Sequence, residues 1–493
     1  MAASNAPAPS PTVPRSVLDV TELPPIADIL HALTEQLAAW MPRQRWYAHK
    51  TGGAPQVEVT GWAPLSCRTD ALVLTVVIQA LPADGPGALY QVPIVLRHPE
   101  DAPTTAELGS EIGVLAVHGG PLRVDDATRD PAGRHALLTQ LLSGAPALGD
   151  RVRLSVQPGP AAADQLPWAG ARANAPVHSR ILSGEQSNTS LIFEQAGTRP
   201  LIMKLFRILS DGENPDVQLQ GALSAAGCDR VPAVAGAVRL ACDDLRTDSA
   251  FAQEFLPDVE DAWRVALDRA AAGADFREPA RALGTALAEV HRELAAAFGT
   301  APTSPQQSSA LLEQMRDRLE QAAREVDGVA QFRGAVESVQ RRAASAPWPP
   351  MQRIHGDLHL GQVLTVPGRG WVLLDFEGEP LRPLAQRTLP DCPLRDVAGM
   401  LRSFDYAAGA VRLERGIDAS GWAADARSAF LGGYADAIGV PESSMGPLLG
   451  AFEADKAVYE ALYEARNRPD WLPIPQMALE RISAAAAEAE SAG

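Results

Sequence analysis

The sequence predicts an α+β protein with two lobes, a strand-rich first half and a mostly helical second half. Short apolar runs typical of strands lie before about residue 257, where Pro257 ends the run 251–256. Stretches with helical periodicity follow at 262–271, 278–298 and 309–343. A length of 493 residues is enough for two to four structural units that each bury a core.

The composition argues against several classes of partner. A formal net charge of −17 argues against binding to nucleic acid or to an anionic membrane. The four cysteines show neither metal-ligand spacing nor a disulfide framework, which fits a reducing compartment. The chain opens without the apolar core of a signal peptide, and no apolar run approaches the roughly 18 residues of a membrane span. We therefore expect a soluble, cytoplasmic protein.

The order of patterns along the chain predicts four segments. The N-terminal segment contains a helix at 26–40, strands at 72–78 and 90–97 and a helix at 134–142, and a Pro/Ala-rich linker near 156–176 follows it. The predicted segments are a disordered Pro-rich tail (1–24), an N-terminal domain (25–160), a strand-rich lobe (161–257) and a helical lobe (258–493).

The most informative stretch is His355-Gly-Asp-Leu-His-Leu-Gly-Gln362, which a hairpin follows. Residues 363–366 and 371–374 are apolar strand formers on either side of the turn Pro367-Gly-Arg-Gly370. If Val366 pairs with Trp371, Gln362 lies opposite Asp375. An amide oxygen and a carboxylate then lie side by side, with the second acid Asp357 upstream.

Such a set of hard oxygen ligands suits Mg²⁺, which prefers protein oxygens together with phosphate oxygens and water. The spacing from Asp357 to Gln362 is that of a kinase catalytic loop, although Asn is usual where Gln362 stands. We therefore predict a Mg²⁺ site at Gln362 and Asp375, with Glu377 as a further ligand.

Lysine usage points to a nucleotide site. Only three of the 43 basic residues are lysines, and they are Lys50, Lys204 and Lys456. In a chain so biased towards Arg, Lys should persist mainly where the wider guanidinium cannot replace it. Lys204 lies in the apolar run Pro200–Phe206, where it is either an outward-facing strand residue or the strand lysine that holds the phosphates of ATP.

The flanking segments supply the other parts expected of an ATP site. Upstream of Lys204, a small polar turn between two strands offers Ser187 and Asn188 to the phosphates. The acid that should pair with Lys204 is open, because the next helix offers Asp216 but has Gln218 where Glu was expected. Glu254 and Leu256, at the end of the strand before Pro257, are the predicted hinge and adenine contacts.

Four motifs together resemble the actinobacterial maltokinases, relatives of the aminoglycoside phosphotransferases. These are 355–362, Asp375-Phe-Glu-Gly-Glu-Pro380, the segment 395–406, and Tyr463-Glu-Ala-Arg-Asn-Arg-Pro-Asp-Trp-Leu-Pro473, with Arg43-Gln-Arg-Trp-Tyr-Ala-His-Lys50 as a fifth, N-terminal likeness. The resemblance implies a bilobal protein-kinase-like fold with an added N-terminal cap domain. It also implies ATP-dependent phosphorylation of maltose to maltose 1-phosphate, feeding α-glucan synthesis from trehalose, with trehalose synthase as a partner.

The interpretation as a sugar kinase gives each residue of the catalytic loop an expected role. Asp357 would accept the proton of the attacking sugar hydroxyl. His355 would brace the loop and His359 would contact the sugar, and a purely structural role stays open for both. Asp396 would either cap its helix or orient the catalytic loop.

A sugar site is predicted on one face of the helix that begins near Phe452. Lys456, Tyr459, Tyr463 and Arg466 recur at spacings of three and four, and Trp471 follows. Aromatic faces and charged groups of this kind bind sugar rings and hydroxyls, although the tyrosines could also be core residues. Glu464 and Tyr406 are weaker candidates.

Three other functions remain open. A metallohydrolase could use His355, Asp357 and His359 as metal ligands, but it leaves Lys204 unexplained. A pseudokinase would bind nucleotide without turnover, and a related kinase would act on another sugar such as glucosamine. Tightly bound zinc would favour the first function and nucleotide binding without turnover the second, whereas a panel of sugars tested with ATP and Mg²⁺ decides on the third.

Overall fold

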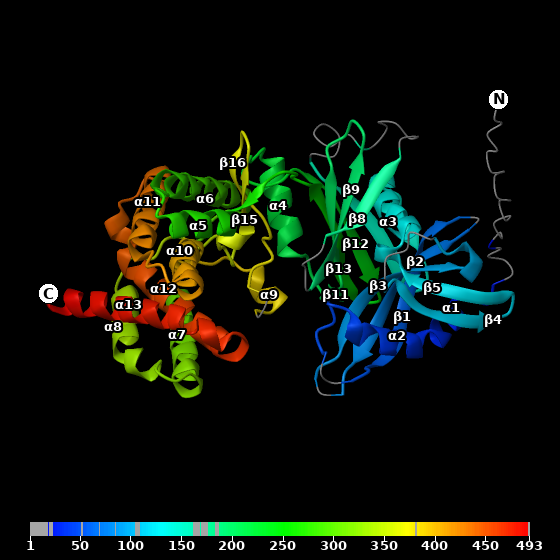
Figure 1. Cartoon of the computed structure of the whole chain (residues 1–493), viewed down its shortest axis with the longest axis horizontal. Helices are drawn as coiled ribbons and strands as arrows, with labels where there is room; N and C mark the ends of the chain where they lie inside the picture. Colours follow the sequence, from blue (N-terminus) through cyan, green and yellow to red (C-terminus); the bar gives the residue numbers. More distant parts are fainter. Residues whose placement is uncertain are drawn as a thin grey trace, which may run out of the picture. The chain divides into compact units, whose positions relative to one another are not determined.

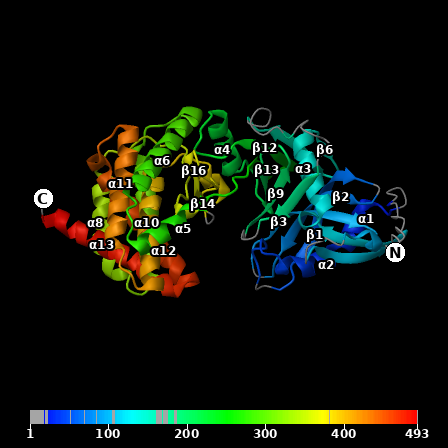
Figure 2. The same cartoon turned by 45° about the horizontal axis from the view of Figure 1, so that its top comes forward.

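The computed structural model divides the chain into two compact units (Figures 1 and 2). The N-terminal unit comprises residues 1–213 and 235–255, and the C-terminal unit comprises 214–234 and 256–493. The chain last passes from one unit to the other at Phe255 and Leu256, the position predicted for the hinge. The residues that the structure describes are 18, 23–50, 53–68, 70–83, 85–103, 109–160, 168, 176–182, 187–379 and 382–491.

The first sheet of the N-terminal unit is antiparallel and has six strands. Its path is β1-β2-β3-β5-β4, and β11 pairs with β3 beside this path. Strands β2 and β3 are buried along almost their whole length, and helices α1 and α2 bury their apolar faces against β1 and β4. The bounds are α1 (Ile26–Ala32), α2 (Thr34–Trp40), β1 (Gln56–Cys67), β2 (Leu72–Leu81), β3 (Ala88–Arg97), β4 (Glu111–Val117), β5 (Gly120–Asp126) and β11 (Ile208–Leu209).

The second sheet has seven strands in the order β6-β7-β12-β13-β10-β9-β8. It continues across the domain boundary predicted at residue 160, because β7 pairs with β12 from Val152↔Cys242 to Pro158↔Gly236. Helix α3 (Pro131–Ser143) contacts strands of both sheets. The strands are β6 (Ala147–Leu148), β7 (Val152–Pro158), β8 (Val177–Ile181), β9 (Asn188–Gln195), β10 (Leu201–Phe206), β12 (Val234–Cys242) and β13 (Leu245–Glu254).

The buried side chain of Arg207 joins the two sheets within the N-terminal unit. Its Nη2 donates to Asp126 Oδ2 at 3.0 Å and to Thr128 Oγ1 at 2.9 Å. The guanidinium also lies 4.9 Å from the centre of the Trp46 ring. Arg207 and Asp126 are each only 1% exposed, so this ion pair is fully removed from water. The predicted cap and the predicted strand-rich lobe therefore share one folded unit.

The C-terminal unit is mostly helical, as predicted. Helices α6, α10, α11 and α12 pack side by side (Figure 1). The same unit contains a short three-stranded sheet in the order β14-β15-β16. The bounds are α4 (Pro215–Ala225), β14 (Glu260–Asp261), α5 (Ala262–Ala272), α6 (Arg277–Phe298), α7 (Pro305–Glu325), α8 (Arg333–Ala344), β15 (Val363–Val366), β16 (Gly370–Leu373), α9 (Leu384–Arg387), α10 (Leu394–Arg415), α11 (Ser420–Ile438), α12 (Glu442–Asn467) and α13 (Pro473–Ser491).

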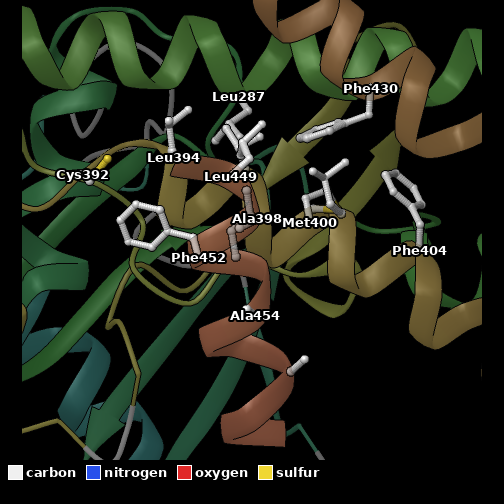
Figure 3. Close-up of a cluster of buried hydrophobic side chains, with 14 of the residues drawn as sticks. Leu287, Cys392, Leu394, Ala398, Met400, Phe404, Phe430, Leu449, Phe452 and Ala454 are labelled. Carbon is white, nitrogen blue, oxygen red and sulfur yellow. The ribbon is translucent and has the colours of Figure 1, made fainter. Parts of the chain in front are cut away.

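The core of this unit lies where α6, α10, α11 and α12 meet (Figure 3). Leu287 of α6, Phe404 of α10, Phe430 of α11 and Phe452 of α12 are at most 2% exposed. Burying an aromatic or Leu side chain stabilises a fold by about 1.5–3 kcal/mol.

The predicted hairpin forms, but its register is shifted by one residue. Val366 pairs with Gly370 and Val363 with Leu373, so Gln362 lies opposite Leu374 and not Asp375. The predicted pairing of Val366 with Trp371 was wrong because the loop is shorter. Arg369 N bonds to Val366 O, and Gly368 (φ +76°) and Gly370 (φ +77°) take left-handed conformations that close a three-residue loop.

Two predicted helices are each divided in the structure. The segment 309–343 forms α7 and α8, and the break contains Gly328 at φ +84°. The segment 26–40 forms α1 and α2, which meet at Leu33. The predicted tail at 1–24 and the linker near 156–176 lie largely outside the described residues. Leu18 and Trp168, which are described there, are both buried. Of the described helices, none is long and apolar enough to cross a membrane.

Candidate active site

The buried carboxylate of Asp396 holds the loop that carries Asp357. Asp396 Oδ2 accepts from His355 N and Oδ1 from Gly356 N, both at 2.8 Å. His291 Nε2 lies 2.9 Å from Oδ2. Burial would raise the pKa of Asp396, but the contacts with His291 and the loop amides keep it below its usual value. Asp396 was predicted either to cap its helix or to orient the loop. The structure shows the second role, because both carboxylate oxygens accept from amides of the loop.

His355 braces the loop from within, as predicted. Its Nε2 lies 2.8 Å from Leu374 O, and its Nδ1 accepts a 3.4 Å bond from Asp357 N. The ring packs on Phe376 with centroids 4.5 Å apart. Both ring nitrogens of His355 thus contact backbone groups, which argues against this side chain as a metal ligand.

Helix α10 approaches the same loop closely enough to require a glycine. A Cβ on Gly399 would lie 2.6 Å from Leu358 O, nearer than real Cβ atoms come to backbone. One turn later, Ser403 Oγ accepts from Leu360 N at 3.0 Å. The position of Asp357 thus depends on contacts with the helix core.

Three carboxylates of the C-terminal unit form a candidate cation site. Oxygen atoms of Asp216, Asp375 and Glu377 all lie within 4.8 Å of one another. Asp375 has φ +63°, a conformation that non-glycine residues seldom adopt, and Phe376 N donates to Asp216 Oδ1 at 2.7 Å. Hard oxygen donors in such a group fit Mg²⁺.

The predicted amide ligand lies beside this group. Gln362 Nε2 donates to Asp375 Oδ2 at 2.9 Å, so side-chain contact is kept despite the shifted register. To coordinate the same cation, Gln362 would have to turn its amide so that the oxygen faces the site. Asp216 was predicted only as a partner for Lys204, and its place in the carboxylate group went unforeseen. Gln218 is directed elsewhere, accepting from Arg353 Nη1 at 2.6 Å.

A cavity of about 490 Å³ opens next to Asp357. Its volume lies in the range of small-molecule sites. The walls come from α5, the catalytic loop, α10 and the end of α12, and most of the side chains are aromatic or charged. They are Trp263, Asp357, His359, Ser403, Tyr406, Lys456, Tyr459, Glu460, Tyr463, Glu464, Arg468 and Trp471, together with Gly361 and Gly399.

Lys456 connects this cavity to the predicted base. Its Nζ lies 3.2 Å from Asp357 Oδ1 and 3.2 Å from Glu379 Oε1. Burial would lower the pKa of Lys456, but the two carboxylates outweigh burial and raise it. The ammonium therefore stays charged at the wall of the cavity, and the role of Lys456 in binding sugar stays a prediction.

Aromatic side chains provide flat walls. Lys456 Nζ lies 5.2 Å from the centre of the Tyr459 ring, and the guanidinium of Arg468 lies 4.6 Å from the Trp471 ring. Tyr463 is 43% exposed, so it is not a core residue. His359 also lines the cavity, and burial lowers its pKa, which favours the neutral ring.

The prediction that Arg466 lines the pocket was wrong. It is exposed and forms an ion pair with Glu325 at the end of α7, because the last turn of α12 directs it towards that helix. Arg468, two residues later, lines the cavity instead and bonds to Glu464. Sequence reasoning also missed Trp263, Glu379 and Glu460. Glu460 shares the i, i+4 spacing with Lys456, and that signal could have identified it.

The predicted nucleotide residues of the N-terminal unit lie on one sheet. Lys204 is on the central strand β10, paired with Ser190 of β9 and Phe251 of β13, and it is partly exposed between the buried Met203 and Leu205. Asn188 begins β9 and Ser187 precedes it, whereas residues 183–186 of the same turn lie outside the described residues. Glu254 ends β13 and binds Arg199 at 3.2 Å. The binding of ATP phosphates by Lys204 and the binding of adenine at the hinge stay predictions.

Comparison with known proteins gives the family. A model described as the phosphotransferase enzyme family matches residues 178–431, more than half of the chain. The chain belongs to this phosphotransferase family. A second model, described as the maltokinase N-terminal cap domain, matches residues 40–130. These matches confirm the predicted kinase-like fold with an N-terminal cap.

Curated relatives of this phosphotransferase are described as glucosamine kinases. That of Mycolicibacterium smegmatis is 31% identical over 339 residues, covering 64% of this chain and 82% of the relative. That of Streptacidiphilus jiangxiensis is 29% identical over 317 residues, covering 60% and 71%. A solved structure of glucosamine kinase in complex with glucosamine, ADP and inorganic phosphate has a TM-score of 0.62 at 23% identity, covering 91% of this chain and 98% of that one. The chain is thus similar to sugar kinases over most of its length.

Proposed function

We propose that this phosphotransferase transfers the γ-phosphate of ATP to the anomeric hydroxyl of maltose, forming maltose 1-phosphate. The observation that carries the proposal is the cavity beside Asp357, whose walls pair several aromatic faces with charged groups, in a chain that carries a maltokinase-type cap. Flat aromatic faces suit the apolar sides of sugar rings, and several of them suit a substrate with two rings.

The chemistry follows from the positions of the side chains. Asp357, held by His355 and Asp396, would accept the proton of the attacking hydroxyl, which contributes roughly 10²–10⁴-fold to the rate. Asp216, Asp375 and Glu377 would hold Mg²⁺, which when bound would neutralise charge on the phosphates. Lys456, itself held by Glu379, would orient Asp357 through their ion pair.

A second candidate substrate is glucosamine, favoured by the descriptions of the curated relatives. An ammonium on the sugar would meet the positive charges of Lys456 and Arg468, but also the carboxylates of Glu460 and Glu464. The cavity charges therefore do not decide between the two sugars. The proposal that maltose is the substrate includes an association with trehalose synthase, the partner that the resemblance to maltokinases implies.

The test is a panel of maltose, glucose, glucosamine and trehalose with ATP and Mg²⁺. ADP release gives the rate, and phosphorus NMR of the product identifies the phosphorylated oxygen. We expect maltose 1-phosphate and loss of turnover when the metal is chelated. Turnover of glucosamine without turnover of maltose would replace the first candidate by the second.

A further inference from the structure

A network of buried charges holds one carboxylate of the sugar cavity in place. Arg402 of α10, whose side chain is 1% exposed, donates to Glu460 Oε2 through Nε at 3.0 Å and Nη2 at 2.7 Å. Its Nη1 donates to Asp405 Oδ2 at 2.8 Å. These two charge-assisted bonds from one planar guanidinium fix the position of Glu460 Oε2.

The rest of the network anchors Arg402 at its far side. Asp405 Oδ2 also accepts from Arg427 of α11 at 3.1 Å and from Arg481 of α13 at 2.8 Å. Both of these arginines also donate to Glu453 of α12. Three arginines thus face three carboxylates across four helices, so the network is neutral and needs no external ion.

Glu460 keeps one oxygen unused in this arrangement. It is 8% exposed and lines the cavity, one turn of α12 after Lys456. Both bonds from Arg402 go to Oε2, and within the described part of the chain no group donates to Oε1. A half-satisfied carboxylate at the wall of a polar cavity is suited to accept from a ligand.

We propose that Glu460 Oε1 accepts a hydrogen bond from a hydroxyl of the acceptor sugar, and that Arg402 is the positioning residue that aims it. The proposal rests on the proposed sugar-kinase function and adds a determinant of substrate specificity to it. A site built to bond one hydroxyl rejects analogues that lack it, because the buried carboxylate is then left unpaired.

The test compares the wild type with Glu460→Gln, Arg402→Lys and Glu453→Gln in steady-state kinetics, varying sugar and ATP separately. Glu453→Gln is the matched control, because it makes the same change on the same helix and in the same network but lies outside the cavity walls. We expect Glu460→Gln to lower kcat/KM for the sugar by about 10- to 100-fold, as for a lost charge-assisted bond, with KM for ATP within about twofold. Glu453→Gln should change the sugar KM clearly less than Glu460→Gln does, because Glu453 contacts neither Arg402 nor the cavity.

Arg402→Lys keeps the charge but loses the planar fork, so the sugar KM should rise in this variant too. The double variant should be no worse than the poorer single variant, because both changes act on one contact. Thermal unfolding of each variant shows that assays run on folded protein. If Glu460→Gln is unfolded at the assay temperature, Arg402→Lys carries the test.

Monodeoxy analogues of the accepted sugar supply the decisive measurement. One analogue should be poor for the wild type yet show no additional penalty in Glu460→Gln. Equal deoxy penalties in both proteins, or equal effects of Glu460→Gln and Glu453→Gln on the sugar KM, would overturn the inference alone. A wild-type protein that phosphorylates no sugar would overturn the proposed function and this inference together.

Discussion

Asp357 and Asp375 are carboxylates of the same unit, but their neighbours differ. Asp357 faces the cavity and an ammonium, whereas Asp375, whose backbone is left-handed, belongs to a group of three acids. Asp357→Asn should therefore lower kcat by roughly 10²-fold or more and leave nucleotide binding nearly intact. Asp375→Asn should instead weaken binding of ATP in the presence of Mg²⁺. Calorimetry with a nucleotide analogue beside initial rates measures both, and equal, mild effects would contradict the assignment.

Lys204 allows a similarly sharp test at the residue scale. It lies on the partly exposed face of a central strand, so its side chain does not belong to the core beneath. If the ammonium holds ATP phosphates, Lys204→Arg should impair activity almost as much as Lys204→Ala, because the wider fork cannot take the same place. The melting temperature should change little in both variants. A Lys204→Arg enzyme with normal dependence on ATP would show that the lysine is only a strand-surface residue.

At the scale of elements, the catalytic loop depends on how closely α10 approaches it. Gly399→Ala would place a Cβ against Leu358 O, and backbone cannot yield as a flexible side chain can. We expect at least a tenfold loss of kcat and about 1–3 kcal/mol of lost stability. The control is Gly421→Ala in α11, where an added Cβ meets nothing within 4 Å. Denaturant unfolding with kinetics checks this, and an active Gly399→Ala protein would show that the loop tolerates displacement.

At the scale of the whole molecule, the cap and the kinase strands should unfold together. The buried pair Arg207–Asp126 joins them, and removal of one partner leaves an uncompensated charge. Asp126→Leu should therefore cost about 3–5 kcal/mol, and the double variant Arg207→Met/Asp126→Leu should recover part of this loss. Chemical denaturation followed by tryptophan fluorescence measures it. Two separate transitions in the wild-type N-terminal unit would contradict a shared fold.

The sequence by itself determined the local patterns on which the candidate site is built. The loop 355–362, the hairpin after it and the i, i+3 and i+4 series of Lys456, Tyr459 and Tyr463 are short-range patterns, and all of them occur in the structure. The two-lobed α+β class followed from where strand and helix periodicities lie along the chain. Such patterns are readable because neighbours in sequence largely set local backbone geometry.

Only the tertiary structure decided which distant groups meet. Arg402 and Glu460 are 58 residues apart, and Asp216 meets Asp375 although 159 residues separate them. Two further features also depend on contacts between remote segments. Strand β7 pairs with β12 in one sheet, and Arg466 forms its ion pair with Glu325 of α7. Ion pairs and strand pairs between remote segments depend on helix packing and sheet order, and no local periodicity specifies these.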